Sequence, residues 1–150
     1  VADINAVDID IKPDGQGLPP GSGNAVSGKL IYQAKCVACH GLSGELMPGK
    51  VLPAPALVSD TVFISRKLNT IGNYWPYATT IFDYIRRAMP YNSAGSLTDS
   101  EVYAVTAYLL HANKIIAKNA VINAGTLPGV VMPAKKYFYN DDRKGGPEVK

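Results

Sequence analysis

The sequence contains few residues of several chemically informative kinds: two cysteines, two histidines and one tryptophan among 150 residues. No apolar run approaches the length needed to cross a bilayer, so we expect no membrane span. The formal net charge is only +3, and no run of Lys and Arg carries interleaved aromatic residues. Nucleic acid is therefore not an expected partner.

The remaining composition is typical of one globular domain. A hydrophobic content of 47% and a charged content of 18% are ordinary for such a fold, and this length suits a single domain with extended flanks. The chain begins with Val1 rather than methionine, which is consistent with a mature protein whose signal peptide has been removed.

Both cysteines lie in one short stretch, Cys36-Val37-Ala38-Cys39-His40. Two thiols separated by two residues and followed by a histidine form the attachment signature of a c-type haem. In that chemistry each thiol adds to a porphyrin vinyl group, and the imidazole takes one axial position on iron. Because bacteria attach such haems outside the cytoplasm, the motif predicts a periplasmic protein with one covalent haem c.

Three other interpretations of the cysteine pair are weaker. A thioredoxin-like redox pair needs a βαβ setting, which the sequence does not indicate. A structural zinc site needs four ligands, and His111 is the only further histidine. A simple disulfide remains open, but none of these three alternatives requires a histidine directly after the second cysteine.

Two helices are expected to frame the haem. The first is predicted over 27–38, with Ser27 as N-cap, and it places Gly28, Tyr32 and Cys36 on one face. A capping box from Thr98 to Glu101 starts the last helix, which ends near Asn113. Gly28 then permits a close crossing of the two helices, and Tyr108 can reach the same crossing.

The loop after His40 is rich in Gly and Pro and is predicted to support the ligand. A ligating histidine usually donates its second ring N–H to a fixed acceptor. Pro55 is the expected source of that carbonyl, with Leu57 packing on the ring and Pro53 as the alternative. The competing interpretation is that these prolines only interrupt regular structure in an ordinary loop.

The middle of the chain is predicted to complete the pocket. A short helix is expected over 60–68, and a second over 80–88, opened by a capping box from Thr80 to Asp83. Trp75 is interpreted either as a donor to a haem propionate or as a plain core residue. The 80–88 helix has an apolar inner stripe that includes Tyr84, which leaves Arg86 and Arg87 towards the rim. There, one arginine is expected either to pair with a propionate or to be solvated at the surface. The expected pocket residues are Tyr32, Pro55, Leu57, Trp75, Tyr84, Arg86, Arg87 and Tyr108.

The second axial ligand must come from elsewhere in the chain. Methionine sulfur opposite histidine raises the reduction potential and makes a one-electron carrier. Met89 is the preferred candidate because it ends a helix ahead of the capped last helix, with Met132 second. Met47 is too near His40 in sequence, and His111 lies in the last turn of its helix. An open sixth position would instead predict ligand binding or peroxidase-like chemistry.

These motifs together resemble a class I cytochrome c over roughly residues 25–115. The resemblance is carried by Gly28-x-x-x-Tyr32-x-x-x-Cys36-x-x-Cys39-His40, Pro55-x-Leu57, Met89-Pro90 and Leu97-Thr98-Asp99-x-Glu101. It implies an all-α globule with crossing first and last helices, and electron transfer through an exposed haem edge. We expect an extended arm over 1–24, the cytochrome domain over 25–117, and an extended tail over 118–150 that packs on the domain or a partner.

A finer resemblance covers residues 71–90 and the later Leu127-Pro128-x-Val130-x-Met132-Pro133. These stretches resemble the cytochrome subunits of bacterial sulfite and sulfane dehydrogenases. The resemblance implies an electron carrier rather than an enzyme, which accepts electrons singly from a molybdenum subunit. It passes them to a downstream cytochrome or terminal oxidase of the respiratory chain. A haem enzyme or ligand-binding protein with a displaceable sixth ligand is the alternative.

Overall fold

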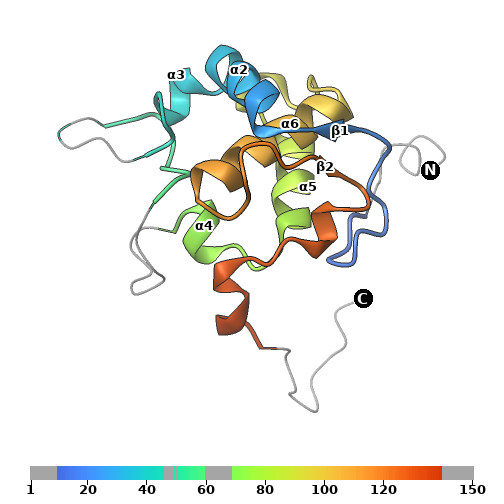
Figure 1. Ribbon diagram of the computed structural model, residues 1–150. Helices are drawn as coiled ribbons and strands as arrows, with labels where there is room; N and C mark the ends of the chain where they lie inside the picture. The colour runs from blue at the N-terminus through green and yellow to red at the C-terminus, as the bar shows by residue number, and fades with distance from the viewer. Residues whose placement is uncertain (1–9, 46–48, 50, 60–68, 140–150) are drawn as a thin grey trace, which may run out of the picture.

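The computed structural model describes residues 10–45, 49, 51–59 and 69–139 (Figure 1). The helices in these ranges are α2 (Ala25–Lys35), α3 (Val37–His40), α4 (Ile71–Tyr74), α5 (Ala78–Ala88), α6 (Asp99–Ala112) and the 3-10 turns η1 (Tyr91–Ser93), η2 (Leu127–Gly129) and η3 (Pro133–Tyr137). The strands β1 (Ser22–Gly23) and β2 (Ile122–Asn123) pair antiparallel. The predicted all-α class is confirmed. The helix expected over 60–68 lies outside the described residues, as does Met47.

The first helix starts earlier than the sequence indicated. Asn24 is extended and its side-chain oxygen accepts hydrogen bonds from the backbone N–H groups of Val26 and Ser27, both at 3.0 Å. Asn24 is therefore the N-cap, and the prediction of Ser27 in that role is wrong. The adjoining Gly23 is held in the β1–β2 pair, so the chain leaves the strand at Asn24 and turns directly into α2.

α2 and α6 cross at Gly28, as predicted. A Cβ atom at this position would overlap the backbone carbonyl of Ala104 and lie 2.9 Å from Cβ of Tyr108. The rings of Tyr32 and Tyr108 meet one turn further along, with centroids 4.9 Å apart. The absent side chain thus lets the two helices pack backbone to backbone and sets where Cys36 follows.

The two predicted capping boxes had different outcomes. At the start of α6, Thr98 N–H donates to Glu101 Oε2 at 2.8 Å and Glu101 N–H donates to Thr98 Oγ1 at 3.3 Å, which confirms the first. α5 begins at Ala78, so the prediction that Thr80 opens it is wrong. Asp83 instead accepts a hydrogen bond from Arg87 on the next turn.

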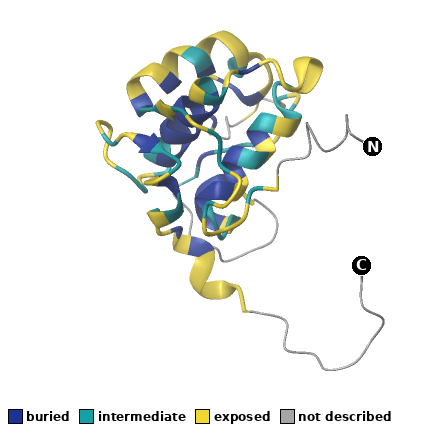
Figure 2. Cartoon of the chain, turned by 90° about the vertical axis from the view of Figure 1, so that its right-hand side faces the viewer, coloured by how far each residue is buried: buried dark blue, intermediate teal, exposed yellow. Residues whose placement is uncertain are grey.

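The segments that flank the helices contribute to the same core. Ile122, Leu127 and Met132 are at most 3% exposed and pack with the apolar faces of α5 and α6. Figure 2 shows the buried residues gathered in the centre of the molecule, with exposed ones around them. Among the described residues, no helix has the length and apolar character that crossing a membrane would require.

Candidate haem-binding site

A cavity of about 710 Å³ lies beside the crossing of α2 and α6. Its wall comes from the end of α2, α3, the 53–57 loop, α4, one face of α5, the 89–92 turn and α6. Most of the wall is apolar, including Ile81 and Ile85 of α5 with Val105 and Leu109 of α6. The volume and lining are those of a site for a large, mainly apolar ligand.

The cysteine motif lies at the edge of this cavity. Backbone hydrogen bonds from Cys36 N–H to Tyr32 O at 2.8 Å and from His40 N–H to Cys36 O at 3.0 Å continue the helical path from α2 into α3. Cys36, Cys39 and His40 all line the cavity, and the two cysteines are not joined in a disulfide. Helical spacing therefore presents two thiols and one imidazole to a single apolar space.

His40 is held by a backbone acceptor. Its Nδ1 lies 2.9 Å from the carbonyl oxygen of Pro55, and the residue is 9% exposed. Nδ1–H donation to this carbonyl leaves Nε2 as the nitrogen that can bind a metal. The carbonyl predicted for Pro55 is thus in place, and Pro53 does not take that position.

The turn after His40 is fixed from inside the molecule by Tyr32. The fully buried Tyr32 hydroxyl donates a hydrogen bond to the carbonyl of Gly41 at 2.9 Å. Burial, and secondarily the neighbouring Tyr108, raises the pKa of Tyr32 well above its ordinary value. The hydroxyl therefore remains a neutral donor at any physiological pH.

Met89 lines the same cavity as His40. It is the C-cap of α5, and its backbone N–H still bonds to Ile85 O at 3.1 Å, so the helix end sets its position. Met132 is 1% exposed within the core and does not line the cavity. His111 also lies away from the wall, with its Nδ1 3.1 Å from the carbonyl oxygen of Ile116.

Five of the eight pocket residues expected from the sequence line the cavity: Tyr32, Pro55, Leu57, Trp75 and Tyr84. The rings of Trp75 and Tyr84 meet edge to face with centroids 5.7 Å apart, so they form one aromatic section of the wall. Tyr108 does not line the cavity. It packs behind Tyr32 and supports the wall rather than forming it.

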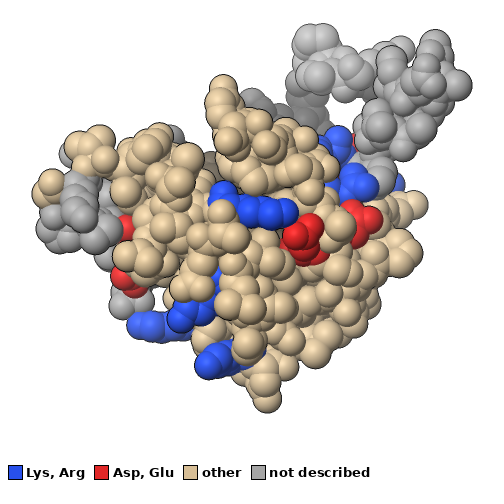
Figure 3. Space-filling view, turned by 90° about the horizontal axis from the view of Figure 1, so that it is seen from above, with Lys and Arg blue, Asp and Glu red and all other residues tan. Residues whose placement is uncertain are grey.

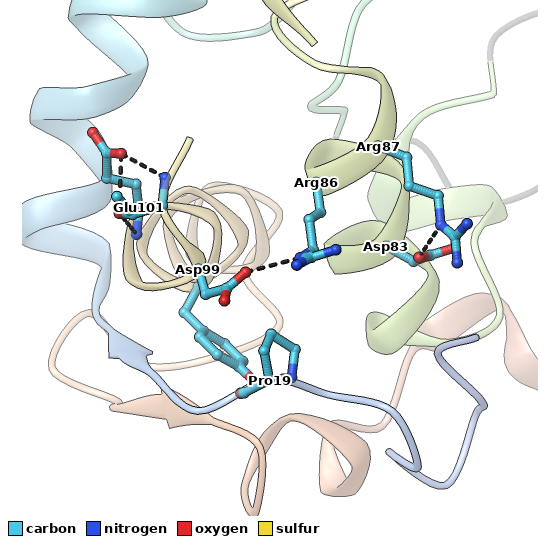
Figure 4. Close-up of polar contacts among 8 residues, drawn as sticks. Pro19, Asp83, Arg86, Arg87, Asp99 and Glu101 are labelled. Carbon is cyan, nitrogen blue, oxygen red and sulfur yellow. Dashed lines mark hydrogen bonds and ion pairs between the residues drawn. The ribbon is translucent and has the colours of Figure 1, made fainter. Parts of the chain in front are cut away.

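Both arginines of α5 pair with carboxylates. Arg86 Nε lies 2.8 Å from Asp99 Oδ1, and Arg87 Nε lies 2.6 Å from Asp83 Oδ1 (Figure 4). Neither arginine lines the cavity. Because Ile81, Tyr84 and Ile85 face the cavity, the helical period directs the following arginines away from it, towards carboxylates on α5 and α6.

Several wall residues were not identified from the sequence. They are Asn69, Thr70 and Ile71 before and at the start of α4, Leu97 ahead of α6, and Asn92 in η1. These residues lie in turns or single-turn helices, where no apolar period marks the inward side chain. Only the packing of α4 against α6 and η3 brings the 69–71 turn to the cavity.

The donor set fits a covalently attached haem better than a thiol redox pair. Burial raises the pKa of the Cys36 thiol to about 11, which keeps it protonated at neutral pH. Reactive thiol–disulfide centres have lowered thiol pKa values instead. An apolar cavity that presents two thiols, a carbonyl-supported imidazole and a thioether matches the chemistry of a c-type haem.

The crossed helices and this cavity define a c-type cytochrome. A scan against protein families matches the family model "Cytochrome c" over residues 25–113. The chain belongs to the cytochrome c family. Membership of this family implies covalently bound haem c, and the chain contains one Cys-x-x-Cys-His motif.

Curated relatives are named thiosulfate dehydrogenase. The chain is 28% identical to a thiosulfate dehydrogenase from Psychrobacter arcticus, with 73% of this chain and 33% of that protein covered. It is 28% identical to one from Allochromatium vinosum, with 71% and 34% covered. The chain therefore spans about a third of the length of these relatives.

A solved structure matches more of the chain. The sulfane dehydrogenase SoxCD from Paracoccus pantotrophus contains a chain that superposes with a TM-score of 0.83 at 37% sequence identity. The match covers 95% of this chain and 69% of that one. It therefore extends past both ends of the cytochrome c domain and includes the β1 and β2 segments.

Proposed function

We propose that the protein is a periplasmic electron carrier that holds one haem c and accepts electrons singly from a molybdenum-containing sulfane or sulfite dehydrogenase. The observation that carries this proposal is the single cavity lined by Cys36, Cys39, His40 and Met89. In a cytochrome, the haem iron alternates between ferrous and ferric forms and supplies the one-electron chemistry.

The chain's own residues have distinct roles in this proposal. Cys36 and Cys39 would anchor the haem, and His40 Nε2 and the Met89 sulfur would bind its iron. The Pro55 carbonyl orients the imidazole. Trp75, which lines the cavity, is the proposed donor to a propionate, and Tyr84 packs against its ring. Ile81, Ile85 and Leu109 exclude water, which favours outer-sphere transfer without ligand exchange.

The partner is inferred from how far the SoxCD match extends. A general cytochrome c relationship would need only residues 25–113, whereas the match to the sulfane dehydrogenase covers 95% of the chain. The flanking segments shared with that chain pack into this protein's core through Ile122, Leu127 and Met132. This supports a sulfane or sulfite dehydrogenase as the electron donor. The proposed acceptor is a downstream cytochrome or terminal oxidase.

The axial ligand assignment is tested by the absorption spectrum of the oxidised protein. Wild type should show the weak charge-transfer band of methionine sulfur bound to ferric iron, and Met89→Ala should abolish it. Met132→Ala is the matched control: it removes a core methionine that does not line the cavity, so it should lower stability and leave the band intact. A band that survives Met89→Ala and is lost in Met132→Ala would reverse the assignment.

A second candidate function is thiosulfate oxidation, favoured by the identity to named thiosulfate dehydrogenases. Thiosulfate oxidation would make the protein a haem enzyme with a displaceable sixth ligand, which is the alternative that the sequence left open. The two candidates differ in what reduces the ferric protein. An enzyme of this kind is reduced by thiosulfate alone, whereas the proposed carrier remains ferric until a dehydrogenase and its substrate are both added.

A further inference from the structure

We call residues 54–58 the His40 support segment. This segment is hydrogen-bonded to the attachment turn, residues 39–44. Ala54 N–H donates to Cys39 O at 3.2 Å, and Leu57 N–H and Val58 N–H both donate to Gly44 O at 2.7 and 3.0 Å. Between these bonds, the Pro55 carbonyl lies 2.9 Å from His40 Nδ1. The support segment and the attachment turn therefore form one hydrogen-bonded unit.

This unit is fastened to the rest of the molecule through the carbonyl of Leu57. That oxygen accepts hydrogen bonds from Ile71 N–H at 3.2 Å and from the side-chain Nδ2 of Asn113 at 3.2 Å. Asn113 is the C-cap of α6, so it connects the support segment to the longest helix of the described chain. Only one residue separates Leu57 from Pro55.

The Asn113 side chain is fixed in one orientation by its other contacts. Nδ2 also donates to Leu109 O at 2.9 Å, while Oδ1 lies 3.4 Å from the backbone N–H of Ser59. The amide thus faces carbonyls with its nitrogen and an N–H group with its oxygen, which excludes the flipped orientation. A Cβ atom on the buried Gly72 would come within 2.5 Å of Oδ1, so α4 packs tightly over the amide.

We propose that Asn113 is a positioning residue for His40. By holding the Leu57 carbonyl to the end of α6, it keeps the His40 support segment in place, and with it the Pro55 carbonyl on Nδ1. Outer partners of this kind fix the orientation of a ligating imidazole and increase its basicity. The proposal rests on the proposed role of His40 as an iron ligand.

The test uses the haem-loaded protein and the variant Asn113→Ala, compared with the matched control Asn123→Ala. Asn123 also uses its side chain to hold backbone, accepting from Gly125 N–H at 2.9 Å and Thr126 N–H at 3.0 Å in the turn after β2, and it does not line the cavity. Asn113→Asp is a second variant of nearly unchanged size that keeps the acceptor for Ser59 and loses both donor contacts. It allows the test even if Asn113→Ala folds poorly.

Two readouts report on His40 itself: the reduction potential, and the proton resonances of the axial imidazole by nuclear magnetic resonance. Asn113→Ala should raise the potential, because a less well held acceptor leaves the imidazole a weaker donor to ferric iron. Asn113→Asp adds a negative charge that itself lowers the potential, so this variant is judged by the imidazole resonances. Both variants should shift the imidazole resonances and speed the solvent exchange of the ring N–H, while Asn123→Ala leaves all three unchanged.

The proposal is overturned if the Asn113 variants unfold more easily but retain the wild-type imidazole resonances, with the potential of Asn113→Ala also unchanged, since Asn113 would then be a helix cap only. Failure of the proposed function is recognised separately. Wild-type protein without imidazole resonances from an iron ligand at His40 would overturn that function, and with it this proposal, before any variant is compared.

Discussion

At the scale of single residues, Glu101 connects the two helices that frame the cavity. Its carboxylate accepts from Thr98 N–H in the capping box and pairs with Lys35 at the end of α2, with Oε1 and Nζ 3.1 Å apart. The backbone hydrogen bond from Thr98, followed by the contact with Lys35, holds the pKa of this carboxyl below its ordinary value. Folding therefore favours the charged form.

This lowered pKa predicts a pH-dependent effect of Glu101→Gln. A carboxyl whose pKa is depressed in the folded state stabilises the fold above its ordinary pKa, and that contribution is lost as the pH falls through the folded-state value. We expect Glu101→Gln to be less stable than wild type in urea denaturation at neutral pH, with the difference shrinking in acid. Asp83→Asn, which alters a surface pair without a capping role, is the control. A difference between Glu101→Gln and wild type that persists unchanged in acid would contradict the assignment.

At the scale of elements, the crossing of α2 and α6 depends on Gly28. An added Cβ would meet backbone of Ala104 rather than a side chain that can move aside. The helices would have to separate, and the end of α2, which leads into Cys36, would move with them. Packing at this crossing therefore sets the position of the attachment motif relative to the wall that α6 contributes.

Gly28→Ala is expected to destabilise the folded protein by about 1–3 kcal/mol, the usual cost of overpacking a tight contact. Gly129→Ala is the matched control, because nothing lies within 4 Å of a Cβ atom at that site, and its effect should stay within about 0.5 kcal/mol. Urea denaturation of the haem-loaded proteins measures both values. Equal stability of the two variants would show that α2 and α6 can separate without cost.

At the scale of the whole molecule, the surface offers no strongly charged face in the view of Figure 3. Lys and Arg side chains lie there in small groups beside Asp and Glu, over a mainly uncharged surface. The formal net charge of +3 is also small. Docking to an electron donor should accordingly use modest charge complementarity around an apolar contact, which gives fast and weak association.

This surface predicts a moderate salt dependence of electron transfer. In the proposed reaction, a molybdenum dehydrogenase and its sulfur substrate reduce the ferric cytochrome. The second-order rate of this reaction should fall as ionic strength rises, because salt screens exposed charges. Stopped-flow absorbance at the haem band measures this rate. Variants of Lys29, which is exposed on α2 and in no ion pair that the structure describes, serve to test whether that face contributes. A second-order rate independent of salt would show that exposed charges do not contribute to docking.

Much of the fold and the centre of the site follow from local sequence. The cysteine motif and the Thr98–Glu101 cap act over a few residues, so spacing alone predicts them. Gly28 is predicted from its spacing to Tyr32 and Cys36 on one helix face. The positions that sequence reasoning missed or misplaced depend on longer range. Asn24 rather than Ser27 is the N-cap, because the β1–β2 pair ends at Gly23, one residue before Asn24.

What the sequence by itself determined is the chemistry: two thiols and an imidazole at fixed spacing, with methionines available as further ligands. Tertiary structure decided the choice among similar groups. It buried Met132 in the core and placed Met89 on the cavity, and it turned both arginines towards carboxylates. It also brought Asn113 to the Leu57 carbonyl of the His40 support segment. These outcomes depend on which helix faces meet, and no short stretch of sequence specifies that.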